Sequence, residues 1–67
     1  MVYRTTFLDE TINTITNDII TINNKNVFIK LSQIRDNLYK LMILDIMCTD
    51  IIKIISNSLF DKIGNST

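Results

Sequence analysis

The side chains in this chain that could take part in chemistry are one cysteine thiol and seven carboxylates, and no histidine accompanies them. Cys48 would act as a nucleophile only as a thiolate, which catalytic sites normally generate with a neighbouring base such as histidine. Since Cys48 follows Met47 in an apolar stretch, we interpret it as a packing residue. A single cysteine also excludes an intrachain disulfide.

Three of the carboxylates, Asp9, Glu10 and Asp18, could suggest acid–base catalysis or a metal site. Asp9 and Glu10 are adjacent, so on a helix their side chains diverge and do not converge on one proton or ion. Negative charge in the first turn of a helix is the simpler interpretation, because it stabilises the helix dipole. The absence of histidine also removes the commonest zinc ligand. We therefore expect no catalytic residue, no metal and no cofactor.

A basic and aromatic group, made of Arg35, Tyr39 and Lys40, could contact nucleic acid. The seven basic residues of the chain balance seven acidic ones and are scattered along it, whereas a nucleic-acid-binding face usually concentrates positive charge. A solvated helix face explains the group more simply. We expect no direct binding of nucleic acid by this segment.

The length and composition of the chain indicate one small domain that depends on a partner for part of its stability. At 67 residues, a single apolar core barely offsets the conformational entropy of the chain. Because we expect neither a disulfide nor a metal, a protein partner is the remaining source of additional stability. The chain contains fourteen isoleucines and neither alanine nor proline, which is typical of an AT-rich genome such as that of a large DNA virus or a low-GC microbe. Charges interrupt every apolar run, so we expect a soluble intracellular protein without a membrane span.

The first element that the pattern predicts is a helix over residues 6–22. Its apolar residues recur at steps of four and three, as expected for one helical face: Leu8, Ile12, Ile15, Ile19 and Ile22. Thr6, followed by Asp9, is the predicted N-cap, and residues 1–5 are a frayed lead-in. A strand is the alternative, because isoleucine and threonine suit a pleated surface, but strict alternation fails at residues 13–14.

A polar turn over residues 23–26 precedes a second predicted helix over residues 27–44. Asn26 is the predicted N-cap of this helix. The helix carries apolar residues at three- and four-residue steps on one face and polar residues on the other. A break follows between Leu44 and Thr49, and Asp45 can adopt the left-handed conformation that ends a helix better than a bulky residue can.

The third predicted helix covers residues 50–62. Either Thr49 or Asp45 is expected to cap its beginning. Gly64, the single glycine of the chain, stands where a C-terminal cap commonly has one. We expect residues 64–67 to be frayed.

This third helix is apolar on more than one face, which is the most informative feature of the sequence. One group of isoleucines, at positions 51, 54 and 55, cannot point in the same direction as Ile52, Leu59 and Ile63. Each isoleucine left exposed forgoes about 1.5–3 kcal/mol of burial, and a contiguous exposed patch usually marks an interface. The residues predicted to form a protein interface are Ile51, Ile54, Ile55, Leu59 and Phe60.

The stretch from Ile34 to Phe60 has leucines at three-residue steps followed by an Asp-Ile-Ile sequence: Leu38, Leu41, Leu44, Asp50, Ile51 and Ile52. This pattern resembles the C-terminal collar domain of clamp-loader small subunits of the replication factor C family. In that family a leucine-rich helix end and a short cap precede a helix that opens with Asp-Ile-Ile or Asp-Ile-Val. The family's Gly-aromatic-Ser-Pro-Glu stretch is replaced here by residues 45–49.

The resemblance implies a collar fragment or a stand-alone remnant, because the glycine-rich phosphate loop of the ATP-binding portion is absent. Collars pack subunit against subunit in a ring, in the nucleus or at a viral replication site. The chain is thus expected to be an all-α, small antiparallel three-helix bundle with short turns that serves as a non-catalytic assembly module in DNA replication. The alternative is a stand-alone viral or regulatory adaptor that homo-oligomerises or binds another protein.

Overall fold

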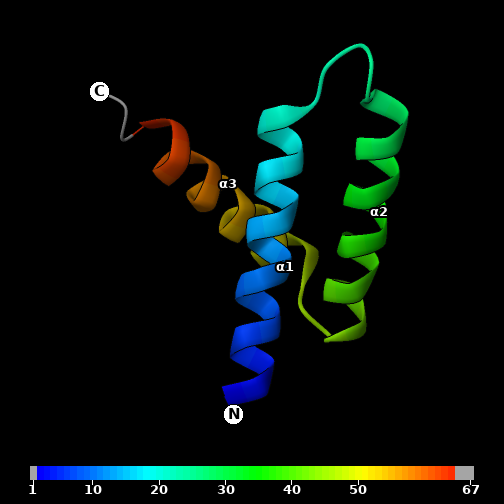
Figure 1. Cartoon of the computed structure of the whole chain (residues 1–67). Coiled ribbons are helices and arrows are strands. Elements are labelled where there is room, and N and C mark those ends of the chain that lie inside the picture. Colours follow the sequence, from blue (N-terminus) through cyan, green and yellow to red (C-terminus); the bar gives the residue numbers. More distant parts are fainter. Residues whose placement is uncertain (1, 65–67) are drawn as a thin grey trace.

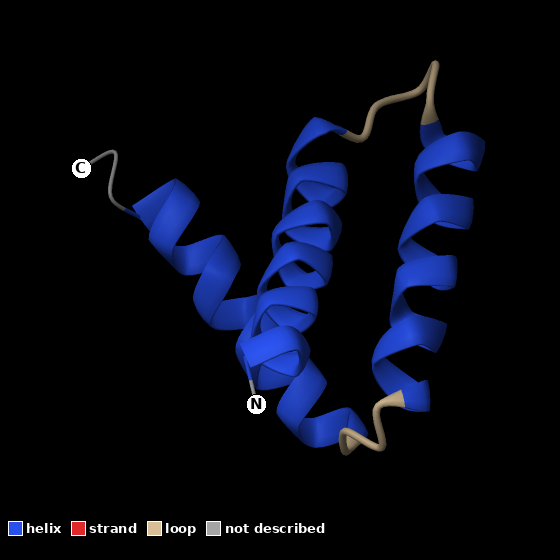
Figure 2. Ribbon diagram, turned by 60° about the horizontal axis from the view of Figure 1, so that its bottom comes forward, coloured by secondary structure: helices blue, strands red, loops and turns tan. Residues whose placement is uncertain are grey.

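The computed structural model describes the backbone of residues 2–64 and the side chains of residues 7–64. Three helices follow one another in this range: α1 (Val2–Thr21), α2 (Val27–Ile43) and α3 (Cys48–Gly64). Figure 1 shows α1 and α2 as an antiparallel pair, with α3 crossing α1 obliquely; Figure 2 shows the same order after rotation. The prediction of an all-α three-helix bundle with short turns is confirmed.

The helix α1 lies between the other two and makes most of the contacts between helices. Its apolar stripe supplies Ile12 and Ile15 to the buried core, while α2 adds Leu41 and α3 adds Ile51. Half-buried apolar residues surround these four side chains: Leu8, Ile19, Ile34, Leu38, Ile46, Ile54 and Ile55. The spacing of apolar residues in the first helix therefore identifies the surface on which both other helices pack.

Threonine-rich α1 is helical because its hydroxyl groups find partners on the helix itself. Four threonine hydroxyls each donate a hydrogen bond of 2.7–2.9 Å to the carbonyl oxygen four residues earlier: those of Thr11, Thr14, Thr16 and Thr21. Because the polar atom is satisfied locally, Thr11 and Thr16 can be buried with the isoleucines. The helical interpretation of this segment is confirmed, and the strand alternative is wrong.

The beginning of α1 differs from the prediction. The helix starts at Val2, so the predicted N-cap at Thr6 and the frayed lead-in are wrong for residues 2–5, and Met1 lies outside the described residues. Residues 2–5 contain neither glycine nor proline, so nothing in their covalent structure stops the helix at Thr6. As a result, Asp9 and Glu10 lie beyond the first turn and do not stabilise the N-terminal end of α1.

The turn between α1 and α2 is held by two asparagine side chains. Asn23 Oδ1 accepts hydrogen bonds from the backbone N–H groups of Lys25 and Asn26, at 2.8 and 3.2 Å. Asn26 Oδ1 accepts from the N–H of Asn23 at 2.7 Å, and Asn26 Nδ2 donates to the carbonyl of Thr21 at 3.1 Å. Asn26 is the N-cap residue of α2, as predicted, but its amide closes the turn and makes no capping hydrogen bond.

The second turn depends on one residue in the left-handed region. Asp45 has φ 63°, and its N–H donates to the carbonyl of Met42 at 2.9 Å. The prediction that Asp45 ends the second helix in this conformation is confirmed. Its N–H satisfies a carbonyl group that the end of α2 leaves without a helical partner.

The beginning of α3 is set by Met47 and not by the predicted caps. The Met47 carbonyl accepts from the N–H groups of Asp50 and Ile51, each at 3.0 Å. Thr49 therefore lies inside the first turn, and Asp45 is engaged in ending α2, so neither residue is the cap of α3. Asp50 does lie in the first turn, where its charge stabilises the helix dipole.

The end of α3 is also different from the prediction. Gly64 is the last helical residue of the described range and does not have a positive φ, so the left-handed glycine cap is wrong. A Cβ at this position would lie 3.3 Å from Cε1 of Phe60. Gly64 thus makes room for the Phe60 ring. The predicted frayed end over residues 65–67 lies outside the described residues.

Two polar interactions lie on opposite edges of the apolar stripe of α1. On one edge, Asp18 is only 5% exposed, and its Oδ1 lies 3.1 Å from Lys30 Nζ of α2, while its Oδ2 is buried without a hydrogen-bond partner. On the other edge, the hydroxyls of Thr16 and Ser58 of α3 are 2.8 Å apart. Since Thr16 donates to the Ile12 carbonyl, Ser58 donates to Thr16. These interactions fix how α2 and α3 sit on α1.

Replacing Lys30 by methionine should lower the free energy of unfolding by about 1–3 kcal/mol, because it leaves the buried Asp18 carboxylate without its cation. Urea denaturation followed by circular dichroism measures the change. The matched control is Arg35→Met, which removes an exposed ion pair with Asp36 at 3.6 Å and should cost at most about 0.5 kcal/mol. Equal losses in the two variants would contradict the structural role of Lys30.

Replacing Asp45 by glycine should raise the free energy of unfolding by about 0.5–1 kcal/mol, since glycine adopts positive φ without the steric cost that a Cβ imposes. Thermal and urea denaturation measure this difference. Asp45→Ala is the control, because it removes the carboxylate but keeps the Cβ, and it should be no more stable than the native chain. A glycine variant less stable than the alanine variant would contradict the prediction.

Candidate interaction surface

The predicted interface residues of α3 divide between two faces of the helix. Ile51 is 5% exposed and belongs to the core, and Ile54 and Ile55 are half-buried against that core. These isoleucines form the face that packs on α1, so the single chain already buries Ile51, and the assignment of Ile54 and Ile55 to an intermolecular surface stays a prediction. The spacing correctly separated two apolar faces of the helix, but it did not indicate which of them meets α1.

The other apolar face of α3 is open. Ile52 is 64% exposed, Phe60 is 75% exposed, Ile63 is also exposed and Leu59 is half-buried. Of the predicted interface residues, Leu59 and Phe60 are thus the two that lie on this open face of α3. Ile52 was not among the predicted interface residues. It directly follows Ile51 in the chain, and consecutive residues point in different directions on a helix, so the sequence already placed it on a different face.

A second open apolar flank lies on α2. Leu31 and Met42 are each 52% exposed, Phe28 is almost fully exposed and Leu38 is half-buried. The residues are separated by steps of three, seven and four along the helix and therefore share one side of it. Sequence reasoning assigned them to the buried face of an ordinary amphipathic helix. That face is wider than α1 alone can cover, because α1 buries only the part around Leu41.

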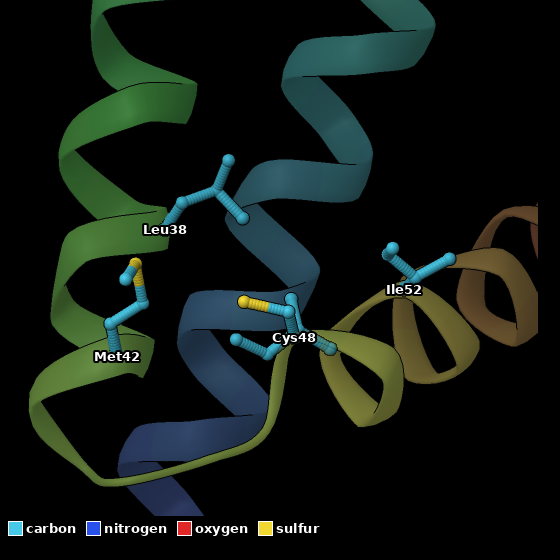
Figure 3. A pocket seen from close by; sticks show the side chains of 5 residues that line it. Leu38, Met42, Cys48 and Ile52 are labelled. Carbon is cyan, nitrogen blue, oxygen red and sulfur yellow. The ribbon is translucent and has the colours of Figure 1, made fainter.

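The flanks of α2 and α3 border a groove of about 230 Å³, which is lined by Leu38, Met42, Cys48, Ile51 and Ile52. In Figure 3, Leu38 and Met42 extend from α2, whereas Cys48 and Ile52 extend from α3, and the sulfur of Cys48 points toward α2. Ile51, from the core, lies in the same lining. The groove is thus a continuation of the core toward solvent.

The chemistry of this groove is that of an apolar binding surface. Its lining carries no carboxylate, amine or guanidinium, and Cys48, although exposed, has no histidine to act as its base. Within residues 2–64, no three side chains of the metal-ligating types form a group that could hold an ion. Such a groove can bury apolar side chains of another molecule, and apart from the Cys48 thiol its lining carries no group suited to proton transfer.

The remaining candidate residues lie away from the groove lining. Asp9 and Glu10 are exposed on α1, and Asp18 is engaged with Lys30. Arg35 donates to the hydroxyl of Ser32 at 3.3 Å on the solvated side of α2, where Tyr39 and Lys40 are also exposed. The structure therefore does not bring the carboxylates and the basic residues together into one site.

Comparison with known proteins adds no relative to this picture. No protein-family model, no curated protein and no solved structure matches the chain. Among the helices of residues 2–64, none has the combined length and apolar character that crossing a membrane requires. The groove between α2 and α3 is accordingly the main candidate functional feature of the described residues.

Proposed function

We propose that this chain is a non-catalytic helical assembly module that binds another protein through the groove between α2 and α3. The observation that carries this proposal is the set of half-exposed apolar residues along both sides of the groove, above all Met42 and Ile52. A partner that covered these side chains would add burial worth about 25 cal/mol for each Å² of apolar surface removed from water.

The open shape of the domain supports the same proposal. The radius of gyration of the Cα atoms is 12.3 Å, against about 11 Å for a compact domain of this length. The difference arises because α2 and α3 both pack on α1 and make few contacts with each other. A helix bundle with this arrangement leaves a position beside α1 that a further helix can fill.

Two classes of protein partner fit an assembly module of this kind. The resemblance of Ile34–Phe60 to a clamp-loader collar favours neighbouring clamp-loader-like subunits in a DNA-replication complex. The alternative is a stand-alone adaptor, viral or regulatory, that associates with itself or another protein. One observation favours the alternative: Ile51, the central residue of the Asp-Ile-Ile match, is a core residue of this chain, so folding of the chain alone explains its presence.

The assembly proposal predicts that the purified chain has a mass above its own 7.8 kDa, either alone or mixed with a ring of clamp-loader subunits. The physical reason is the burial of the open flanks of α2 and α3. Analytical ultracentrifugation of the two samples measures the mass. A chain that sediments as a 7.8 kDa species in both samples would exclude an assembly function with these partners.

The proposal also predicts that the pure chain does not hydrolyse ATP. The groove lining provides neither a general base nor a ligand for magnesium, and with one glycine the chain has no glycine-rich phosphate loop. Release of inorganic phosphate from Mg-ATP measures the activity, with an intact clamp-loader complex as the positive control. Turnover that co-purifies with the chain through several columns would overturn the non-catalytic assignment.

A further inference from the structure

One basic residue lies among the apolar residues of the open flank of α2. Arg35 follows Leu31 by four residues and precedes Leu38 by three. It also precedes Met42 by seven residues, and residues at these spacings share one side of a helix. The Arg35 side chain is 62% exposed. Its guanidinium therefore lies on the side of α2 from which Leu38 and Met42 line the groove.

The acidic residues of α2 and α3 lie on other sides of these helices. Within the two helices, both of which the structure describes in full, the acidic residues are Asp36, Asp50 and Asp61. Each is two positions away from an apolar residue of the open surfaces, and these apolar residues are Leu38, Ile52 and Leu59. Two positions correspond to a rotation of about 200° around a helix. The open surfaces of α2 and α3 thus carry no carboxylate.

The open face of α3 also has a basic residue beside it. Lys53 is exposed and precedes Phe60 by seven residues, so the two side chains share one side of α3. The other lysine of α3, Lys62, donates to Asn17 of α1 and therefore lies toward α1. Both open surfaces thus combine apolar side chains with positive charge.

From this arrangement we infer that the occupant of the groove is an amphipathic helix of another protein, with acidic residues bordering its apolar stripe. The inference rests on the proposed assembly function and specifies the chemistry of the partner. A helix can place apolar side chains at three- and four-residue steps into the groove between α2 and α3. Acidic residues beside that stripe would lie near Arg35 and Lys53, and this complementarity selects the partner.

Arg35 has hydrogen-bond donors left for a carboxylate of the partner. Its Nε lies 3.6 Å from Oδ1 of Asp36, and both side chains are more than half exposed, so this ion pair is weak. One terminal nitrogen donates to the hydroxyl of Ser32 at 3.3 Å. Because a guanidinium carries five N–H donors in a planar fork, Arg35 can still bind an incoming carboxylate.

The same charges disfavour a second copy of the chain as the occupant. A two-fold dimer brings the same surface of both copies into contact. The open flank of α2, a helix that the structure describes in full, carries Arg35 and no carboxylate. Two such flanks in contact would bring positive charges together without a negative charge between them. A partner of different sequence avoids this repulsion.

Two synthetic peptides test the inference by fluorescence anisotropy with the full chain at low ionic strength. Each is a helix of about 18 residues with leucines at three- and four-residue steps, and either glutamates or lysines border the leucines. We expect the glutamate peptide to bind at least about fivefold more tightly than the lysine peptide. Added salt should reduce this difference, because it screens exposed charges.

Arg35→Glu should reverse the preference, so that the lysine peptide binds more tightly. The matched control is Lys40→Glu, which makes the same change of charge on α2. Lys40 is exposed and two residues away from both Leu38 and Met42, so this variant should keep the native preference. Met42→Ser should weaken both peptides, since it removes apolar contact without changing charge. Circular dichroism should show the same helix content in all three variants.

Equal affinity for the two peptides would overturn the inference. If Met42→Ser still weakened both peptides in that case, the assembly function would stand without selection by charge. A preference that Lys40→Glu reverses as fully as Arg35→Glu would overturn the placement of the acidic residues beside Arg35. A single-stranded oligonucleotide that displaces the glutamate peptide would instead assign Arg35 to nucleic acid and would also overturn the inference.

The state of the chain without peptide separates this inference from the proposed function. A native chain that forms a dimer, which Met42→Ser dissociates, would assign the groove to a second copy and overturn the inference while the assembly function stands. Binding of neither peptide at up to about 1 mM overturns the inference as well. If the chain also stays at 7.8 kDa alone and with clamp-loader subunits, both proposals fail.

Discussion

The structure depends on the burial of one face of α1 beneath the two other helices. Ile12 and Ile15 are covered by Leu41 from α2 and by Ile51 from α3, and these four form the buried apolar cluster of the described range. Because α2 and α3 make few contacts with each other, each is held mainly through α1. A change that weakened the packing on α1 would therefore release both of its neighbours.

The polar residues of α1 decide where those neighbours lie. Thr16 and Asp18 are two positions apart, which places them about 200° apart around a helix of 3.6 residues per turn. Thr16 shares a hydrogen bond with Ser58 of α3, and Asp18 forms an ion pair with Lys30 of α2. Lys62 of α3 also donates to the side chain of Asn17 at 2.8 Å. The outer helices are thus held on opposite edges of the apolar stripe, and the groove is the space between them.

This arrangement connects the fold to the proposed function. A bundle in which the outer helices closed on each other would bury Met42 and Ile52, whereas the observed packing leaves both residues half-exposed at the groove. The core and the groove share Ile51, so a partner bound in the groove would extend the core of the domain. Assembly and stability are therefore properties of the same apolar surface.

The order of the residues was enough to predict the helical class, the apolar face of α1, the left-handed residue Asp45 and the presence of two apolar faces on α3. These features depend on spacing along one helix or on the conformational preference of one residue, which are local properties. The caps were predicted less well, because Thr6 is preceded by residues that continue the helix and the amide of Asn26 is engaged in the turn.

The packing of the helices was needed to establish which face of α3 meets α1, and with it that Ile51 belongs to the core while Ile52 borders the groove. It also decided that α2 keeps an open flank along Leu31 and Met42. The physical reason is that periodicity identifies the residues that share a face of a helix, whereas the choice of partner for that face depends on contacts between residues far apart in the chain, such as Thr16 with Ser58.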